Sequence, residues 1–133
     1  MTVRPEGGAY EWFRRGLHLL ENGHAAAAAT LLGHAAEHQP DSASVLEALA
    51  RAQFDSGQTS DAVESFERLV ELTPDADYAR FGYGLSLARM GRFDEALQQL
   101  KLATVMRPDR PEYAQELRQV RATLAARREP PAS

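Results

Sequence analysis

The sequence contains no cysteine, one lysine, one asparagine and no long apolar run. Without a thiol, the chain cannot form disulfide bonds, thiolate zinc sites or a cysteine nucleophile. The longest aliphatic stretch is interrupted by Thr30 and falls short of the ~20 apolar residues that span a bilayer. Residues 1–8 also lack the basic and then apolar order of a secretory signal. We therefore expect a cytoplasmic protein without a membrane span.

The composition fits a single domain of modest size. Of the 133 residues, 44% are hydrophobic, which is enough to build a core. Fifteen basic residues stand against nineteen acidic ones, and the formal net charge of −4 argues against general binding to nucleic acid or anionic lipid. Twenty-three alanines and fourteen arginines suggest a GC-rich bacterial genome. Alanine also favours helices that cross closely.

Four sets of residues recur with a period of 34, which predicts an internal repeat. They are the dipeptides Pro40-Asp41, Pro74-Asp75 and Pro108-Asp109, the glycines Gly23, Gly57 and Gly91, the alanines Ala28, Ala62 and Ala96, and the small residues Gly16, Ala50 and Gly84. Each of these turn glycines can end a helix, and each proline predicts a helix end at the residue before it, namely Gln39, Thr73 and Arg107. The aspartate after each proline can cap the next helix. Each period is thus predicted to hold two helices that cross at the small residues.

This pattern resembles the tetratricopeptide repeat, in which aromatic, small and alanine positions precede a closing proline. The positions that match are Trp12, Gly16, Leu19, Ala28, Leu32, Ala35 and Pro40 in residues 9–42, then Leu46, Leu49, Ala50, Ala62, Phe66 and Pro74 in residues 43–76, and Tyr83, Gly84, Leu87, Ala96, Leu100, Ala103 and Pro108 in residues 77–110. Arg15, Gln53 and Leu69 depart from the pattern. The resemblance implies an all-α array of three helical hairpins, a TPR-like α-solenoid.

The remaining residues are interpreted as a leader at 1–8, a capping helix at 111–128 and a disordered tail at 129–133. Tyr113, Leu117, Val120 and Leu124 follow one another at steps of 4, 3 and 4, which is the spacing of an amphipathic helix. A repeat array must cover its terminal apolar face, so this helix is expected to pack on the third repeat. The chain is then expected to contain about seven antiparallel helices.

The resemblance also implies a concave groove, lined by the first helix of each repeat, that binds a peptide or an amphipathic helix of another protein. Carried over by position, the predicted lining is Tyr10, Phe13, Leu17 and Leu20, then Glu47, Arg51 and Phe54 beside Ser44, and finally Tyr78, Phe81, Leu85 and Arg89 beside Ala88. Steps of three and four residues place each set on one helical face. The alternative is that the aromatic residues pack between helices and that Glu47 pairs with Arg51.

The predicted function is that of a non-catalytic protein-interaction module without cofactor or metal. The rival prediction is an accessory subunit whose groove is filled by self-association or by a permanent complex. Nucleic-acid contact is a weaker alternative, because the net charge is negative; it would use Arg118, Arg121, Arg127 and Arg128. The basic and amide clamp with which some family members bind chaperone C-termini is not expected, since the one asparagine, Asn22, lies at a turn.

Two further patterns are better explained by the helices themselves. His34, Glu37 and His38 match an inverted zinc-protease motif, but they lie on the second helix of a repeat, on its outward side, without a downstream acidic ligand. Residues 43–76 hold two basic and seven acidic residues, whereas residues 77–110 hold six and four. The acids include Asp61, Glu64, Glu67 and Glu71 on one helix. Such polarity is typical of solvated surface and can also favour self-association.

Overall fold

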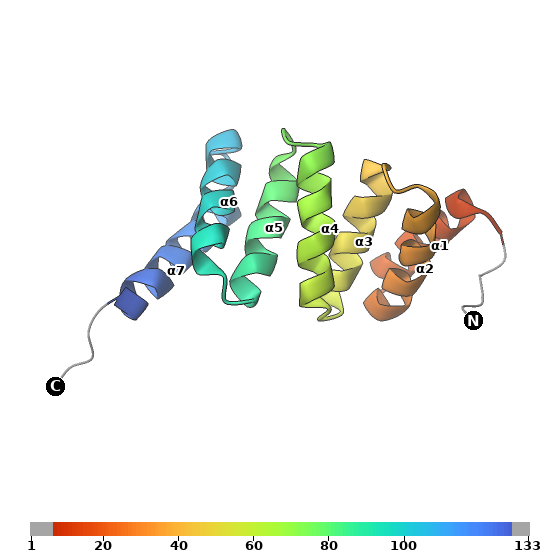
Figure 1. Ribbon diagram of the computed structural model, residues 1–133, viewed down its shortest axis with the longest axis horizontal. Coiled ribbons are helices and arrows are strands. Elements are labelled where there is room, and N and C mark those ends of the chain that lie inside the picture. Colours follow the sequence, from red (N-terminus) through yellow and green to blue (C-terminus); the bar gives the residue numbers. More distant parts are fainter. Residues whose placement is uncertain (1–6, 129–133) are drawn as a thin grey trace.

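The computed structural model describes residues 7–128, which form seven α-helices and no strand. The helices are α1 (Ala9–Glu21), α2 (Ala25–His38), α3 (Ala43–Asp55), α4 (Thr59–Leu72), α5 (Asp77–Arg89), α6 (Phe93–Met106) and α7 (Pro111–Arg128). Helices α3 to α6 follow one another side by side across the molecule, and each helix packs chiefly against its neighbours in the chain (Figure 1). This arrangement confirms the all-α hairpin array. The predicted tail at 129–133 and residues 1–6 of the predicted leader lie outside the described residues.

The turn inside each hairpin is closed by the same pair of backbone hydrogen bonds. In the first hairpin, Gly23 N–H donates to the carbonyl of Leu20 at 3.1 Å, and His24 N–H donates to the carbonyl of Leu19 at 2.8 Å. Gly23 has a φ of 82°, and Gly57 and Gly91 repeat this geometry at 82° and 77°. This is the Schellman ending, in which a residue with positive φ satisfies the last carbonyls of a helix. The predicted turn glycines are therefore confirmed.

The turn between successive hairpins is built on the Pro-Asp dipeptide. The C-caps of α2, α4 and α6 are the predicted residues, Gln39, Thr73 and Arg107. Ser42 N–H donates to the carbonyl of Gln39 at 3.1 Å, which closes a β-turn with proline and aspartate at its two central positions.

The prediction that the aspartates cap the following helices is wrong, because those helices begin one residue later than it assumed. The cap of α3 is Ser42, whose hydroxyl accepts a hydrogen bond from Val45 N–H at 3.3 Å. The cap position of α5 is Ala76, which has no capping side chain. Asp41 instead pairs with Arg68 of α4 at 2.6 Å.

Close helix crossings depend on the predicted small residues. Ala28, Ala50, Ala62 and Ala96 are completely buried. A Cβ at Gly16 would lie 2.5 Å from Leu32 Cγ, and a Cβ at Gly84 would lie 2.8 Å from Leu100 Cγ. Since real side chains do not approach so closely, the two helices of these hairpins can pack at this distance only with glycine there.

The core is a succession of contacts between neighbouring hairpins. One cluster joins α1, α2 and α3, a second joins α3, α4 and α5, and a third joins α4, α5, α6 and α7. The predicted apolar face of α7 is buried, with exposed fractions of 8% or less at Tyr113, Leu117, Val120 and Leu124. The third cluster contains Leu87 and Leu100, so α7 covers the last apolar face of the array.

Two of the departures from the repeat pattern have a structural reason. Gln53 stands where the repeat pattern has an aromatic residue, and its side-chain oxygen accepts a 2.6 Å hydrogen bond from the hydroxyl of Ser65, which is 9% exposed. The two polar groups thus satisfy each other between α3 and α4. Arg15 is exposed on α1, whereas Leu49, one period later on α3, is buried.

Candidate functional site

A groove formed by two adjoining pockets runs along α3, α5 and α7. The first pocket has a volume of about 150 Å³ and is lined by Arg51, Phe54, Asp55, Phe66, Tyr78, Phe81, Gly82 and Leu85. The second has a volume of about 380 Å³ and is lined by Phe54, Leu85, Ala88, Arg89, Phe93, Glu116, Gln119, Val120 and Thr123. Phe54 and Leu85 belong to both linings, so the pockets meet at these two side chains.

The residues predicted on α3 and α5 come together in this groove, except Ser44 and Glu47. Arg51, Phe54, Tyr78, Phe81, Leu85 and Arg89 line one or both pockets. Glu47 is exposed on α3 and lines neither of them.

Phe81 has a second role as a packing residue. Its ring stacks on that of Tyr113 with the centroids 4.4 Å apart, and the Tyr113 hydroxyl donates to Asp77 at 2.6 Å. Helix α7 thereby holds one wall of the groove in place.

The residues predicted on α1 lie elsewhere. Tyr10 is 69% exposed, with the Arg14 guanidinium 6.0 Å from its ring centroid. Phe13 and Leu17 are half-buried against the core, and Leu20, only 8% exposed, is part of that core. The prediction that Leu20 presents a surface to a ligand is corrected, because its side chain packs with α2 and α3.

Several residues that line the groove were not predicted from the sequence. Phe66, from α4, forms the floor of the first pocket although it is 2% exposed. It reaches this place because Gly82 has no side chain: a Cβ there would lie 2.3 Å from Phe66 Cε1. Glu116, Gln119 and Thr123 come from α7, which the repeat pattern does not include. The one available signal was Gly82, a glycine inside a predicted helix.

Charges of both signs border the first pocket. No ion pair joins Glu47 to Arg51 among the pairs of the described residues. Burial raises the pKa of Tyr78, nearby Arg51 opposes this rise, and Glu47 and Asp55 add to it. The Arg89 guanidinium lies 3.9 Å from the centroid of the Phe54 ring, a cation–π contact between α5 and α3. The groove is thus apolar at its floor and charged at its rim.

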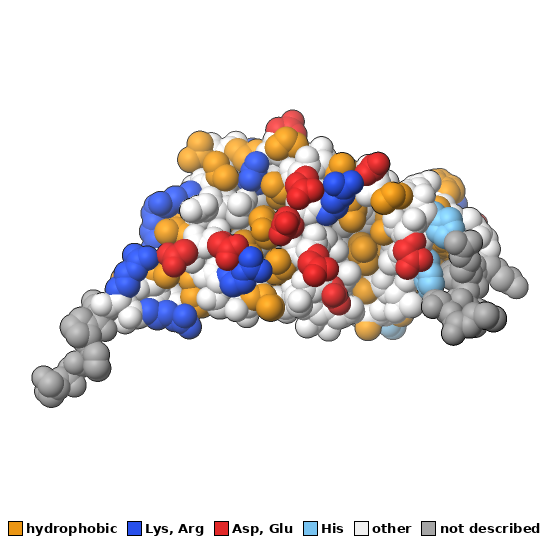
Figure 2. Space-filling model, in the orientation of Figure 1, with side chains coloured by type: hydrophobic (Ala, Val, Ile, Leu, Met, Phe, Trp, Pro, Cys, Tyr) orange, Lys and Arg blue, Asp and Glu red, His pale blue; other side chains and the backbone are white. Residues whose placement is uncertain are grey.

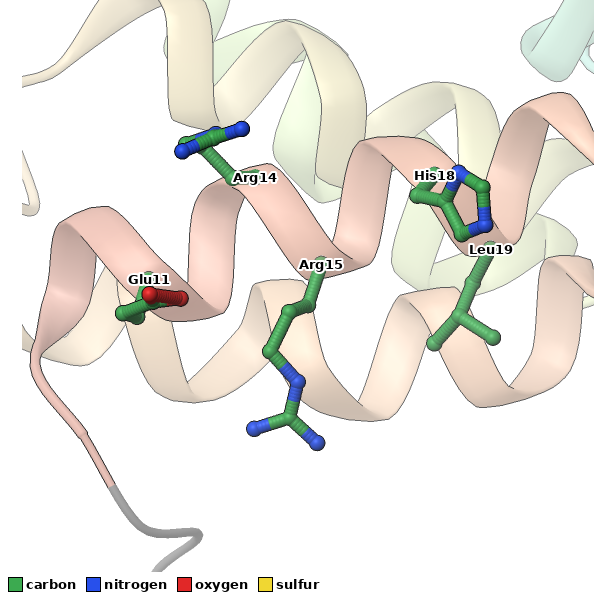
Figure 3. Close-up of a pocket in the computed structure, with 5 residues that line it drawn as sticks. All are labelled: Glu11, Arg14, Arg15, His18 and Leu19. Carbon is green, nitrogen blue, oxygen red and sulfur yellow. The ribbon is translucent and has the colours of Figure 1, made fainter.

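A further hollow, of about 440 Å³, lies on the outer face of α1 and is lined by Glu11, Arg14, Arg15, His18 and Leu19. All five side chains come from one helix, and Figure 3 shows Arg14 and Arg15 pointing in opposite directions. One period after Glu11, Arg14, Arg15 and His18, the corresponding residues of α3 are buried. They are Val45, Ala48, Leu49 and Ala52. We therefore interpret this hollow as the polar end face of the array, without converging ligand groups.

The histidine motif on α2 has a packing role. The rings of His34 and His38 lie edge-on to Trp12, with centroids 6.2 and 4.9 Å away. Glu37 and His38 are exposed, as expected for the outward side of α2, whereas His34 is half-buried beside the buried tryptophan of α1. Within residues 7–128, no group of three potential metal ligands comes together.

The balance of acidic and basic side chains changes along the face shown in Figure 2. Figure 2 shows acidic side chains over the region of α4 and the densest Lys and Arg side chains toward the α7 end. Arg128 pairs with Asp94 at 3.0 Å, and the Arg127 guanidinium lies 4.5 Å from the Phe93 ring centroid. Two of the four arginines considered for nucleic-acid contact are therefore engaged within the protein. No helix in the described part of the chain is long and apolar enough to cross a membrane.

Comparison with known proteins identifies the repeats. The model of a tetratricopeptide repeat family matches residues 13–58 and 47–111. The chain belongs to the tetratricopeptide repeat family. It is 32% identical over 111 residues to Superkiller complex protein 3 of Mus musculus, and 28% identical over 100 residues to the same protein of Homo sapiens. These matches cover 82% and 75% of the chain but only 7% and 6% of the much longer relatives.

Solved structures share the fold. MamA MSR-1 superposes with a TM-score of 0.83 at 22% identity, over 90% of this chain and 68% of that one. The first TPR of Spaghetti (RPAP3), bound to the HSP90 peptide SRMEEVD, superposes with a TM-score of 0.82 at 18% identity, over 93% of this chain and 99% of that one. At these identities the likeness concerns the fold.

Proposed function

We propose that this protein is a non-catalytic interaction module that binds a peptide or an amphipathic helix of another protein in the groove along α3, α5 and α7. The observation that supports the proposal is the continuous pair of pockets with apolar walls, which open beside the partly exposed Tyr78. A surface cleft with apolar walls and a few polar groups is typical of a binding site. The peptide bound to the first TPR of Spaghetti shows that this fold can serve such a function.

The proposed function needs neither catalysis nor a bound cofactor or metal ion. Catalysis, a resident cofactor and a metal site are not part of the proposed function, because the groove brings together aromatic rings and scattered charges without a nucleophile beside a base. A cytoplasmic location and a bacterial origin stay predictions from composition.

The test is a charge placed in the groove, compared with the same charge outside it. Tyr78→Glu combined with Leu85→Glu alters the first pocket, and Tyr10→Glu alters the residue two periods before Tyr78, which lines neither pocket. A photo-crosslinking residue at Ala88 reports groove occupancy in native extract, and the same residue at Gln98 on α6 is the control. We expect crosslinks from position 88 that the groove double variant abolishes and Tyr10→Glu retains. Identical crosslinks in the two variants, each shown by circular dichroism to be folded, would refute binding in the groove.

A second candidate function, an accessory subunit in a permanent complex, is favoured by an apolar patch on α6. Leu102 and Val105 are 44% and 78% exposed. One period earlier the corresponding residues of α4 are Arg68 and Glu71, which pair with each other at 3.3 Å. Apolar residues are exposed on α6 at positions that are charged in the preceding repeat, which suggests that another protein covers this surface.

Self-association end to end is less favoured, because exposed arginines occur at both ends, Arg14 and Arg15 on α1 and Arg118 and Arg121 on α7. Like charges would therefore meet.

The accessory-subunit candidate is tested by measuring the mass of the native species in extract. It predicts a stable complex from which the double variant Leu102→Glu, Val105→Lys is released. If the protein is a free monomer in extract, the accessory-subunit candidate is excluded.

A further inference from the structure

We infer that the groove selects a segment that carries one large apolar side chain and, close to it, a single carboxylate. The apolar side chain enters the first pocket, between α3 and α5, and the carboxylate binds Arg89. This inference rests on the proposed function and adds the chemistry of the partner to it.

The first pocket is built to take a side chain. Its walls are Phe54, Tyr78, Phe81 and Leu85, and its floor is the ring of Phe66. Its volume of about 150 Å³ is well above the ~10–15 Å³ of such space that holds one water molecule. Burial of a Leu, Met or Phe side chain against these rings would release that water and gain the hydrophobic contribution of the whole side chain.

The depth of this pocket depends on Gly82. Because a Cβ at position 82 would overlap the Phe66 ring, only glycine lets that ring lie beneath α5. The residue one period earlier is Ala48, which is 3% exposed and packs in the core with Leu49. The pocket is therefore a local feature of the α3–α5 junction and does not recur at each step of the array.

Arg89 supplies a cation beside the pocket that lacks an acidic partner. Arg68, Arg92, Arg107, Arg110 and Arg128 each form an ion pair within the chain. The ion pairs of residues 7–128 include neither Arg51, which lines the first pocket beside Asp55, nor Arg89. The Arg89 guanidinium lies over the ring of Phe54, a residue shared by both pockets. A guanidinium held over an aromatic face still has N–H groups available for a carboxylate.

The other charges of the groove limit the partner to one carboxylate near this point. Asp55 borders the first pocket and Glu116 the second, against Arg51 and Arg89. A run of acidic residues would place its further carboxylates beside Asp55 and Glu116, where like charges repel. Charge complementarity therefore favours a mixed apolar and singly acidic segment over a strongly acidic one.

The experiment is a selection of random twelve-residue peptides displayed on phage against the full chain. Selected peptides are then synthesised and titrated by fluorescence anisotropy. We expect them to share one Leu, Met or Phe with one Asp or Glu within a few residues. Replacing the apolar residue by Ala should weaken binding at least about tenfold, and replacing the acid by its amide should weaken it about fivefold.

The variant Arg89→Gln separates the carboxylate contact from the rest of the site. It should bind the acidic and the amide peptide equally, while the control Arg118→Gln, on the exposed face of α7, should keep the fivefold preference. Selected peptides that crosslink to position 88 but lack the apolar and acidic pair, or whose preference survives Arg89→Gln, would overturn this inference and leave the proposed function standing. Failure to select any peptide that crosslinks there would overturn both.

Discussion

At the scale of single residues, Gly16 and Gly33 show that the surroundings of a glycine decide how its replacement by alanine changes the stability of the protein. Both lie inside helices, α1 and α2, where alanine is intrinsically favoured. A Cβ at Gly33 would meet nothing within 4 Å, whereas a Cβ at Gly16 would overlap Leu32, which is completely buried and has no room to move.

The two substitutions to alanine should therefore have opposite effects on the free energy of unfolding. Gly33→Ala should stabilise the protein by about 0.5–1 kcal/mol through helix propensity. In Gly16→Ala, the crowding cost of about 1–3 kcal/mol should exceed that gain. Urea denaturation followed by circular dichroism measures both, and a stabilised Gly16→Ala would contradict the close helix crossing.

The Gln53–Ser65 hydrogen bond gives a second prediction at this scale. Gln53→Leu should destabilise the protein by about 1–2 kcal/mol, because it leaves the buried Ser65 hydroxyl without its partner. Adding Ser65→Leu should recover much of the loss, since Leu19 and Leu31 occupy the two corresponding positions one period earlier. A double-mutant cycle measures the coupling, and additive effects would show that the hydrogen bond contributes nothing.

At the scale of elements, α7 combines two roles that a repeat helix does not need. Its apolar face covers the cluster containing Leu87 and Leu100, and its Tyr113 holds Phe81 at the first pocket. Its polar side contributes Glu116, Gln119 and Thr123 to the second pocket. The helix that ends the array therefore also completes the groove.

Removal of α7 should abolish cooperative unfolding. A chain ending at Arg110 would expose the apolar face of α5 and α6, so we expect aggregation or a broad, early thermal transition. In the full chain, Leu117→Asp should cost about 3 kcal/mol or more, whereas the adjacent exposed Arg118→Asp should cost little. A shortened chain that melts like the full one would show that the cap is dispensable.

At the scale of the whole molecule, the response to alkaline pH should report the packing of the tyrosines. Burial, followed by the hydrogen bond to Asp77, raises the pKa of Tyr113 far above its ordinary value of 10.0. Burial also raises the pKa of Tyr78 and of Tyr83. A raised pKa in the folded state means that the unfolded chain loses the phenol proton first as the pH rises.

The free energy of unfolding should consequently be unaffected by these groups below pH 10 and should fall above it, as the unfolded chain ionises. Tyr113→Phe keeps the ring stacked on Phe81 but has no proton to lose, so its stability should fall less steeply. Urea titrations from about pH 8 to 12 compare the slopes. Equal slopes would mean that the Tyr113 hydroxyl is not held by the folded state.

Local backbone rules and periodicity were enough to predict the architecture from the sequence. A glycine with positive φ and a proline that ends a helix act through their own residues and immediate neighbours, so Gly23 and Gln39 could be placed without knowing what packs around them. The 34-residue period then predicted the hairpins, and the spacing of Tyr113 and Leu117 predicted the capping helix. The aspartate caps failed because a Pro-Asp turn needs one more residue before the helix begins.

The tertiary structure alone decided which side chains of the predicted groove a partner could reach. Leu20 and Tyr10 share a helical face, yet one is core and the other is exposed, because accessibility depends on what the next hairpin places against each side chain. The floor of the pocket comes from Phe66, which reaches past Gly82. The position of the Arg89 guanidinium likewise depends on a ring from another hairpin. Contacts between different hairpins cannot be read from the repeat pattern of one hairpin. The sequence therefore predicted residues of α3 and α5 that line the groove, but not the floor of its first pocket or the wall that α7 supplies.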